Sequence, residues 1–320
     1  MLVVSMAAVA RQRALCVETG CWPAAWILGC PKCASTSVWL LLHDSLGFCG
    51  AELAGLLEGE AEWHEKETHF WSGRGVVNTS MVPVIGELFT ELYPVRKVGD
   101  SCASFVEGTP DNLRTIDAAT LLKKSAPPSV SGLFRFVVVL REPIARDLSW
   151  YNHVRRASRK LLREHECNVS VSYEEYARCH AEKFEATFPR SQEKGLWGGV
   201  YKLQLDLWTR WFDRSQILVF DFASLVVYNT TTYIRTLASF LGVDDDHIIP
   251  ATIPHRNVVG AGDNQQRTID CETRDLLEGI FAPWNEQLYA LLDQDHRAKR
   301  AWVGEPPFRP FDPMPCHHHY

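Results

Sequence analysis

The chain has 320 residues, of which 46% are apolar and 22% charged, and this ordinary globular composition is enough to bury one large core. Its formal net charge of −6 argues against a nucleic-acid-binding surface, because such a surface needs a clustered excess of Lys and Arg. The uncharged apolar runs are far shorter than the roughly 20 residues of a membrane-spanning helix, so we expect no transmembrane segment.

Three regions are predicted along the chain. Residues 1–22 are read as an N-terminal extension, residues 23–300 as one functional domain, and residues 301–320 as a Pro-rich tail. The first ten residues are apolar without a leading basic region, so they represent either the cut end of a signal or anchor, or a disordered terminus.

Strands and helices are expected to alternate. Apolar runs at 25–28, 134–140 and 215–222 predict strands, and apolar residues at helical spacing predict helices over 200–211, 233–241 and 273–292. Residues 45–95 and 100–130 are rich in Gly and Pro and are expected to be irregular. The alternation predicts an α/β fold, in which helices flank both faces of a mainly parallel central sheet and ligands bind at the carboxyl ends of the strands.

Residues 29–37 (GCPKCASTS) read as a P-loop-like phosphate-binding loop between the first strand and a helix. Small residues allow an anion to approach, backbone N–H groups and the helix dipole attract it, and Lys32 adds a mobile charge. The usual ATP-binding pattern has Gly-Lys directly before Ser/Thr, whereas Lys32 comes four residues before Thr36, so a Walker-type kinase is disfavoured. An ordinary strand-to-helix turn without a ligand is the alternative.

Cys30 and Cys33 also form a C-x-x-C motif, which is typical of zinc sites and redox pairs. A structural zinc needs four ligands, and the chain has no second C-x-x-C motif, so the phosphate loop is favoured. The ten cysteines are too few for a disulfide scaffold in a chain of this size, although Cys167 and Cys179 could pair in an oxidising compartment.

A second phosphate contact is predicted after the strand at 134–140. Arg141 stands at the end of this strand, and Ser149 comes eight residues later on the following helix. A guanidinium and a hydroxyl placed in this way can converge on one phosphate. Together with the first loop they indicate a nucleotide with phosphates at two separated positions, whereas Arg141 alone could equally be a structural ion-pair partner.

These motifs resemble those of sulfotransferases that use 3′-phosphoadenosine 5′-phosphosulfate (PAPS), especially the Golgi carbohydrate and heparan-sulfate types. GCPKCASTSVWLLL is similar to the family's 5′-phosphosulfate loop, and VVVLREPIARDLSWYNH is similar to its 3′-phosphate segment. KETHFW is similar to Lys-Glu-x-His-Phe-Phe, VEGTP to Glu-Lys-Thr-Pro, and WTRWFDRSQILVFDFASL and APWNEQLYALL to later elements. The likeness runs in order from about residue 26 to residue 292.

The resemblance implies in-line transfer of a sulfuryl group from PAPS to a carbohydrate acceptor, to hydroxyls rather than amines and without a metal. Lys32 would stabilise the leaving phosphate, and Glu67 would be the base, with His69 as its supporter or alternative. A surface pair of Glu67 with Lys66 or Arg74, with His69 packed among aromatic rings, is the other interpretation. The residues implied to bind the cofactor are Lys32, Cys33, Ala34, Ser35, Thr36, Ser37, Arg141, Ser149 and Arg267.

The chain departs from the family pattern at several positions. Ala34 replaces a loop Gly, while Ser72 and Gly108 replace an Asp and a Lys on the acceptor side, so heparan-specific recognition does not carry over. Of the family's Lys-Gly-Arg nucleotide loop only Arg267 remains, and Arg256 competes for this role.

The acceptor and the compartment are less closely defined by the sequence. Arg155, Arg159 and Arg163 share a helical face that either binds an acidic polysaccharide or is simply solvated. Three glycosylation sequons are compatible with a glycoprotein of the Golgi or secretory lumen, and the cytoplasm is the alternative; they start at Asn78, Asn168 and Asn229.

Two other functions compete with sulfuryl transfer. One is an ATP-dependent P-loop kinase of a small molecule or sugar, which would need Mg²⁺ ligands and a Gly-Lys-Ser/Thr loop. The other is a catalytically inactive PAPS-binding homologue, against which the retention of Lys32 and Glu67 argues.

Overall fold

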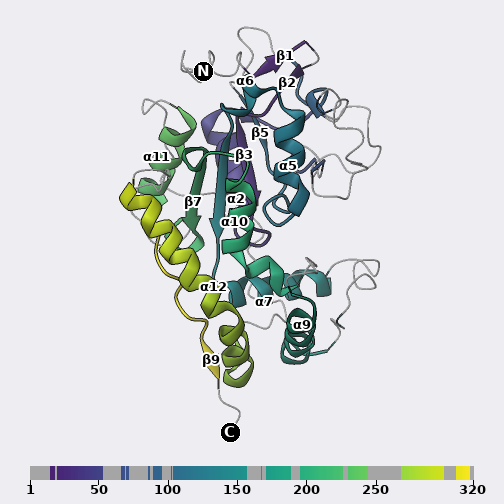
Figure 1. Ribbon diagram of the computed structural model, residues 1–320, viewed down its shortest axis with the longest axis vertical. Helices are drawn as coiled ribbons and strands as arrows, with labels where there is room; N and C mark the ends of the chain where they lie inside the picture. The colour runs from purple at the N-terminus through teal and green to yellow at the C-terminus, as the bar shows by residue number, and fades with distance from the viewer. Residues whose placement is uncertain are drawn as a thin grey trace.

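The computed structural model is shown in Figure 1. It describes residues 15–18, 20–52, 66–68, 70–71, 86, 89–95, 102, 104–156, 167, 171–188, 195–225, 230–243, 268–298 and 308–317.

A 5-stranded, all-parallel sheet forms the centre of the molecule, in the order β4-β5-β3-β6-β7. Its strands are β3 (Ala25–Gly29), β4 (Phe48–Cys49), β5 (Ser104–Glu107), β6 (Arg135–Leu140) and β7 (Ile217–Asp221). From β3 the chain runs to the β4 edge, and from β6 it runs to the β7 edge. Because these two connections diverge, a crevice is expected beyond the carboxyl ends of β3 and β6.

Helices and short strand pairs surround this sheet. In the described part of the chain the α-helices are α2 (Ser35–Leu40), α5 (Ile116–Ser125), α6 (Pro128–Ser131), α7 (Pro143–Arg156), α9 (Tyr173–Thr187), α10 (Tyr201–Thr209), α11 (Thr230–Leu241) and α12 (Cys271–Ala298). A π-helical segment, Leu41–Ser45, continues α2, and 3-10 helices span Leu196–Gly199 and Arg214–Gln216. β1 (Cys16–Val17) pairs antiparallel with β2 (Gly20–Cys21), and β8 (Ile269–Asp270) pairs parallel with β9 (Cys316–His317).

Helices cover both faces of the sheet. The ring of Phe136 on β6 lies 5.1 Å from Trp208 on α10, whereas the ring of Phe220 on β7 lies 5.5 Å from Tyr233 on α11. Phe220 is in register with Val139, three positions after Phe136, so Phe136 and Phe220 point to opposite faces. This arrangement confirms the predicted α/β fold. In Figure 1, α12 runs along the sheet to α7 and α9 at its lower end.

The predicted strands and helices are present, with shifted ends. β3, β6 and β7 lie at the predicted positions, α10 follows a separate 3-10 turn, and α12 extends through Pro283. Gly242, with a φ of 73°, follows the end of α11 in the left-handed conformation that commonly ends a helix.

The expectation that residues 100–130 are irregular is wrong. They contain β5, α5 and α6. β5 is a short but fully buried strand, and α5 buries Ala118, Ala119, Leu121 and Leu122 on one side. The Gly and Pro residues of this region belong to the turns between the elements. They dominate its composition, so the short apolar patterns of the strand and the helices were not recognised in the sequence.

All ten cysteines are paired, whereas the sequence left the pairing open. The pair Cys167–Cys179, considered from the sequence, is present. The other pairs are Cys16–Cys21, Cys30–Cys33, Cys49–Cys102 and Cys271–Cys316. Connectivity could not be read from the sequence, because pairing depends on which loops the fold brings together.

The segment 308–317 packs against α12. Phe308 and Phe311 contact the ring of Tyr289, whose hydroxyl accepts a hydrogen bond from the Phe311 backbone at 3.0 Å. The bond between Cys271 and Cys316 fixes this segment to the start of α12.

Replacing Val138 by alanine tests how strongly the central strand supports the fold. Val138 is fully buried between Gly29 and Val219 on the neighbouring strands. We expect the free energy of unfolding, measured in urea, to fall by about 2–3 kcal/mol, because methyl groups are lost and a cavity remains. Val95→Ala is the matched control, since Val95 is 58% exposed and the same change should cost less than about 0.5 kcal/mol. Equal losses in the two variants would contradict the assignment of β6 to the core.

Candidate functional site

The predicted phosphate loop connects β3 to α2 at the carboxyl end of the sheet. Lys32 and Ala34 have φ angles of 71° and 66°, a left-handed conformation that costs a non-glycine residue about 1–2 kcal/mol. Alternation of left- and right-handed residues turns successive N–H groups toward one side and makes an anion-binding concavity. Ala34 also occupies the N-cap of α2 without a side-chain cap, so the helix start is open to an anionic ligand.

Positive charges gather around this loop. Burial and, after it, the nearby charges of Arg156, Arg141, Lys66 and Arg146 together lower the pKa of Lys32 to about 8. In a chain with a net charge of −6, this concentration of cations is a local arrangement. Because like charges repel at close range, an anion bound among them would relieve the repulsion.

Lys66 connects the phosphate loop to the candidate base. Its ammonium is 4% exposed and donates hydrogen bonds to Thr36 Oγ1 at 3.0 Å, to Ser35 Oγ at 3.4 Å and to Glu67 Oε1 at 2.5 Å. The structure therefore contains the Lys66–Glu67 pair that the sequence offered as an alternative, but the Lys66 side chain is buried and not at the surface. The Glu67 carboxylate lies beside the loop, with a side chain that is 19% exposed.

The end of β5 holds the Lys66 segment in position. The Gly108 N–H donates to the Lys66 carbonyl at 2.8 Å, and the buried Glu107 accepts a hydrogen bond from the Thr109 N–H at 3.0 Å. A Cβ atom at Gly108 would lie 2.9 Å from both Lys66 Cγ and Trp39 Cδ1. Glycine at this position therefore allows the close packing of Lys66 against the helix start.

Arg141 reaches the same loop from the end of β6. Its Nη1 donates to the Lys32 carbonyl at 3.3 Å, and its guanidinium lies over the Phe222 ring at 4.8 Å. Burial lowers the pKa of Arg141. Ser149 lies half-buried on α7, and among the described residues no hydrogen bond joins it to Arg141. The structure thus brings Lys32 and Arg141 together, while the role of Ser149 stays a prediction.

Arg146 is a site residue that the sequence reasoning missed. Its side chain is 1% exposed, with Nε donating to the Pro31 carbonyl at 3.4 Å and Nη1 donating to the Gly195 carbonyl at 3.3 Å. A Cβ at Gly198 would come within 2.4 Å of the guanidinium. Arg146 therefore supports the phosphate loop from below, and only the proximity of Arg146 to Arg141 in the sequence could have pointed to it.

His153 and Arg156 were also missed. His153 lies one turn after Ser149 on α7, and Arg156 lies one turn further. Burial, Lys32 and Arg156 lower the pKa of His153 to about 4, while the nearby Glu67 raises it. His153 is therefore neutral at pH 7, and although its side chain is exposed, the charges of Lys32 and Glu67 act on it. The helical spacing from Ser149 was the available signal, but the sequence reasoning followed the Arg155 face instead.

Several predicted residues lie outside the described part of the chain. They are His69, Ser72, Arg74, Asn78, Arg159, Arg163, Asn168, Asn229, Arg256 and Arg267. Within the described residues, no group of three His, Cys, Asp or Glu side chains is arranged to hold a metal ion. No helix of the described chain is long and apolar enough to cross a membrane.

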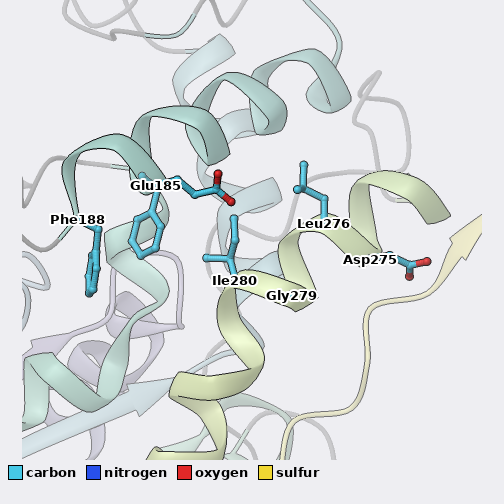
Figure 2. A pocket seen from close by; sticks show the side chains of 7 residues that line it. Glu185, Phe188, Asp275, Leu276, Gly279 and Ile280 are labelled. Atoms are coloured by element: carbon cyan, nitrogen blue, oxygen red, sulfur yellow. The ribbon is translucent and has the colours of Figure 1, made fainter.

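A separate pocket of about 540 Å³ lies between α9 and α12. Figure 2 shows Glu185 and Phe188 on one side and residues of α12, including Leu276 and Ile280, on the other. None of its lining residues belongs to the phosphate loop or to the end of β6.

Comparisons with known proteins support the fold. No protein-family model matches the chain, and no curated protein sequence is similar to it. Among solved structures, the crystal structure of a sulfotransferase from Alicyclobacillus acidocaldarius is 21% identical, with a TM-score of 0.54 over 88% of this chain and 98% of that chain. The parallel sheet and flanking helices of this chain therefore form a fold that it shares with a sulfotransferase.

Proposed function

We propose that this chain is a PAPS-dependent sulfotransferase that moves a sulfuryl group onto a hydroxyl of a carbohydrate acceptor. The observation that carries the proposal is the meeting of Lys32, Lys66 and Arg141 at one loop beyond β3 and β6. The fold shared with a sulfotransferase supports it.

The described residues fit a donor with phosphates at two places. The loop from Cys33 to Ser37, with its open helix start and left-handed turn, suits the 5′-phosphate. Arg141 and Ser149 would hold the 3′-phosphate from the end of β6 and from α7, and the sequence assigns a further contact to Arg267, which lies outside the described residues. A second phosphate position separates PAPS from ATP-like nucleotides.

The chemistry proposed for the side chains follows from their positions. When bound, PAPS supplies an activated sulfuryl group. The Lys32 ammonium would stabilise negative charge that develops on the leaving phosphate oxygen. Glu67 would accept the proton of the attacking hydroxyl, and Lys66 would orient the Glu67 carboxylate toward the loop.

His153 offers a second proton acceptor at the same place. Its imidazole is neutral at pH 7 because burial and the neighbouring cations oppose protonation. A neutral imidazole can accept a hydrogen bond or a proton from the acceptor. We propose that His153 assists Glu67, in addition to the role assigned to His69.

We propose an acidic glycan as the class of acceptor and an oxidising compartment as the location. Arg155 and Arg156 at the end of α7 extend the positive charge away from the loop, which suits an acidic glycan. The pairing of all ten cysteines favours an oxidising compartment such as the Golgi or the secretory lumen over the cytoplasm.

Thermal unfolding in the presence of nucleotides tests the donor class. We expect 3′-phosphoadenosine 5′-phosphate, the product nucleotide, to raise the melting temperature equally with and without Mg²⁺, because the site binds both phosphates through cations of the protein. ATP should stabilise the chain less. If only ATP with Mg²⁺ stabilised it, the kinase alternative would replace our proposal.

The affinity for this nucleotide should depend on pH through Lys32. The free protein has a Lys32 pKa of about 8, and the charged form binds the anion, so affinity should be full at pH 7 and fall by up to about tenfold per pH unit above pH 8. Titration calorimetry at pH 7, 8 and 9 measures this change, and phosphate groups do not titrate in that range. Lys32→Gln should bind more weakly, without this dependence. A wild-type affinity that is constant from pH 7 to 9 would contradict the role of Lys32.

Transfer of labelled sulfate from PAPS to a panel of neutral and acidic glycans tests the catalytic roles. Glu67→Gln should lower kcat by about 10²–10⁴-fold while leaving the affinity for 3′-phosphoadenosine 5′-phosphate within about threefold, because the base acts on the acceptor. Lys32→Ala should lower both the rate and the nucleotide affinity. Nucleotide binding without transfer to any glycan by the wild type would favour the inactive-homologue alternative, and unchanged transfer by Lys32→Ala would exclude our leaving-group assignment.

A further inference from the structure

We infer that the Cys30–Cys33 disulfide holds the phosphate loop in its anion-binding shape and is a positioning element of the donor site. The inference rests on the proposed function, since it concerns the same loop. It accounts for the C-x-x-C motif, for which zinc binding and redox chemistry were the disfavoured alternatives to the phosphate loop.

The two sulfurs are not available for either of those roles. Each is bonded to the other, so neither can bind zinc. Both cysteines are 0% exposed, which denies a protein substrate the access that thiol exchange requires. The Cys30–Cys33 disulfide is therefore assigned a structural role within the loop.

Cys30 is anchored to the sheet. Its backbone N–H donates to the Val139 carbonyl on β6 at 2.9 Å, which extends the pairing of β3 and β6 beyond Gly29. The Tyr201 hydroxyl lies 3.5 Å from the Cys30 sulfur and donates to the Arg141 carbonyl at 2.8 Å. Cys30 is therefore a fixed point that borders both halves of the proposed donor site.

Cys33 lies in the strained part of the loop. Its neighbours on both sides, Lys32 and Ala34, are the two non-glycine residues of the described chain with positive φ. The Cys33 N–H donates to the Cys30 carbonyl at 3.1 Å, and the disulfide adds a covalent link across the same turn. The disulfide thus ties Cys33 to a residue that the sheet holds in place. It keeps Lys32 and Ala34 in their unfavourable left-handed conformations without a ligand.

The double variant C30S/C33S tests this role, with C16S/C21S as the matched control. The control removes a disulfide of similarly short span, five residues apart instead of three, in the β1–β2 hairpin. Titration calorimetry with 3′-phosphoadenosine 5′-phosphate should show about tenfold weaker binding for C30S/C33S. It should also show loss of the pH dependence near pH 8 that Lys32 confers. C16S/C21S should bind within about twofold of the wild type at every pH.

The outcomes separate this inference from the proposed function. If the wild type and C30S/C33S bind the nucleotide equally, the positioning role is overturned and the proposed function stands. If the wild type does not bind the nucleotide, the proposed function is overturned, and the inference with it. A loss of affinity in C16S/C21S as large as in C30S/C33S would also overturn the inference, because it would show a general effect of stability.

A measurement on the wild type covers the case in which C30S/C33S does not fold. Trypsin cleaves after Lys32, so Cys30 and Cys33 fall on different peptides that stay joined only through a disulfide. After alkylation under denaturing, non-reducing conditions, mass spectrometry should find these peptides linked. Labelled thiols on both cysteines would overturn the inference.

Discussion

The crowding of positive charge around one strained turn is the constraint on which the rest of the site depends. Lys66, Arg141 and Arg146 lie close to Lys32 on the loop, and after burial it is their charges and that of Arg156 that lower the pKa of Lys32. Such a cluster is stable only if rigid elements hold each cation, since flexible side chains would move apart. Hydrogen bonds to the Lys32 and Pro31 carbonyls, and to the Thr36 hydroxyl, provide that hold.

The parallel sheet explains why these segments meet. β3, β5 and β6 are neighbours, and all of them end at the same edge, so the residues that follow them become adjacent although they are far apart in sequence. Gly108 follows β5 and donates a hydrogen bond to the Lys66 carbonyl, while Arg141 and α7 follow β6. The helices on both faces protect the backbone pairing beneath the site. The packed sheet therefore holds in place the residues of the candidate site, which follow the carboxyl ends of its strands.

Local patterns were sufficient to predict part of this arrangement. The strand, loop and helix around Lys32, and the position of Arg141 at a strand end, follow from short-range periodicity and were predicted. The contacts of Lys66 with Ser35 and Thr36 join residues about thirty positions apart, and no local pattern encodes them. Disulfide pairing and the burial of Arg146 likewise depend on the assembled fold. The missed elements between residues 100 and 130 are short, and their turns dominate their composition.

Gly108 shows how packing restricts the substitutions that the chain can accept near the candidate site. The family pattern that the chain resembles has a lysine there, but in this chain even a methyl group would collide with Lys66 and Trp39. A charged side chain cannot be restored by one substitution, because Trp39 and the buried lysine would have to shrink or move first. Under the proposed function, a change of acceptor preference in descendants of this chain, or in engineered versions of it, must therefore arise at other positions. The tight packing of Lys66 and Trp39 against Gly108 therefore excludes a larger side chain at this position.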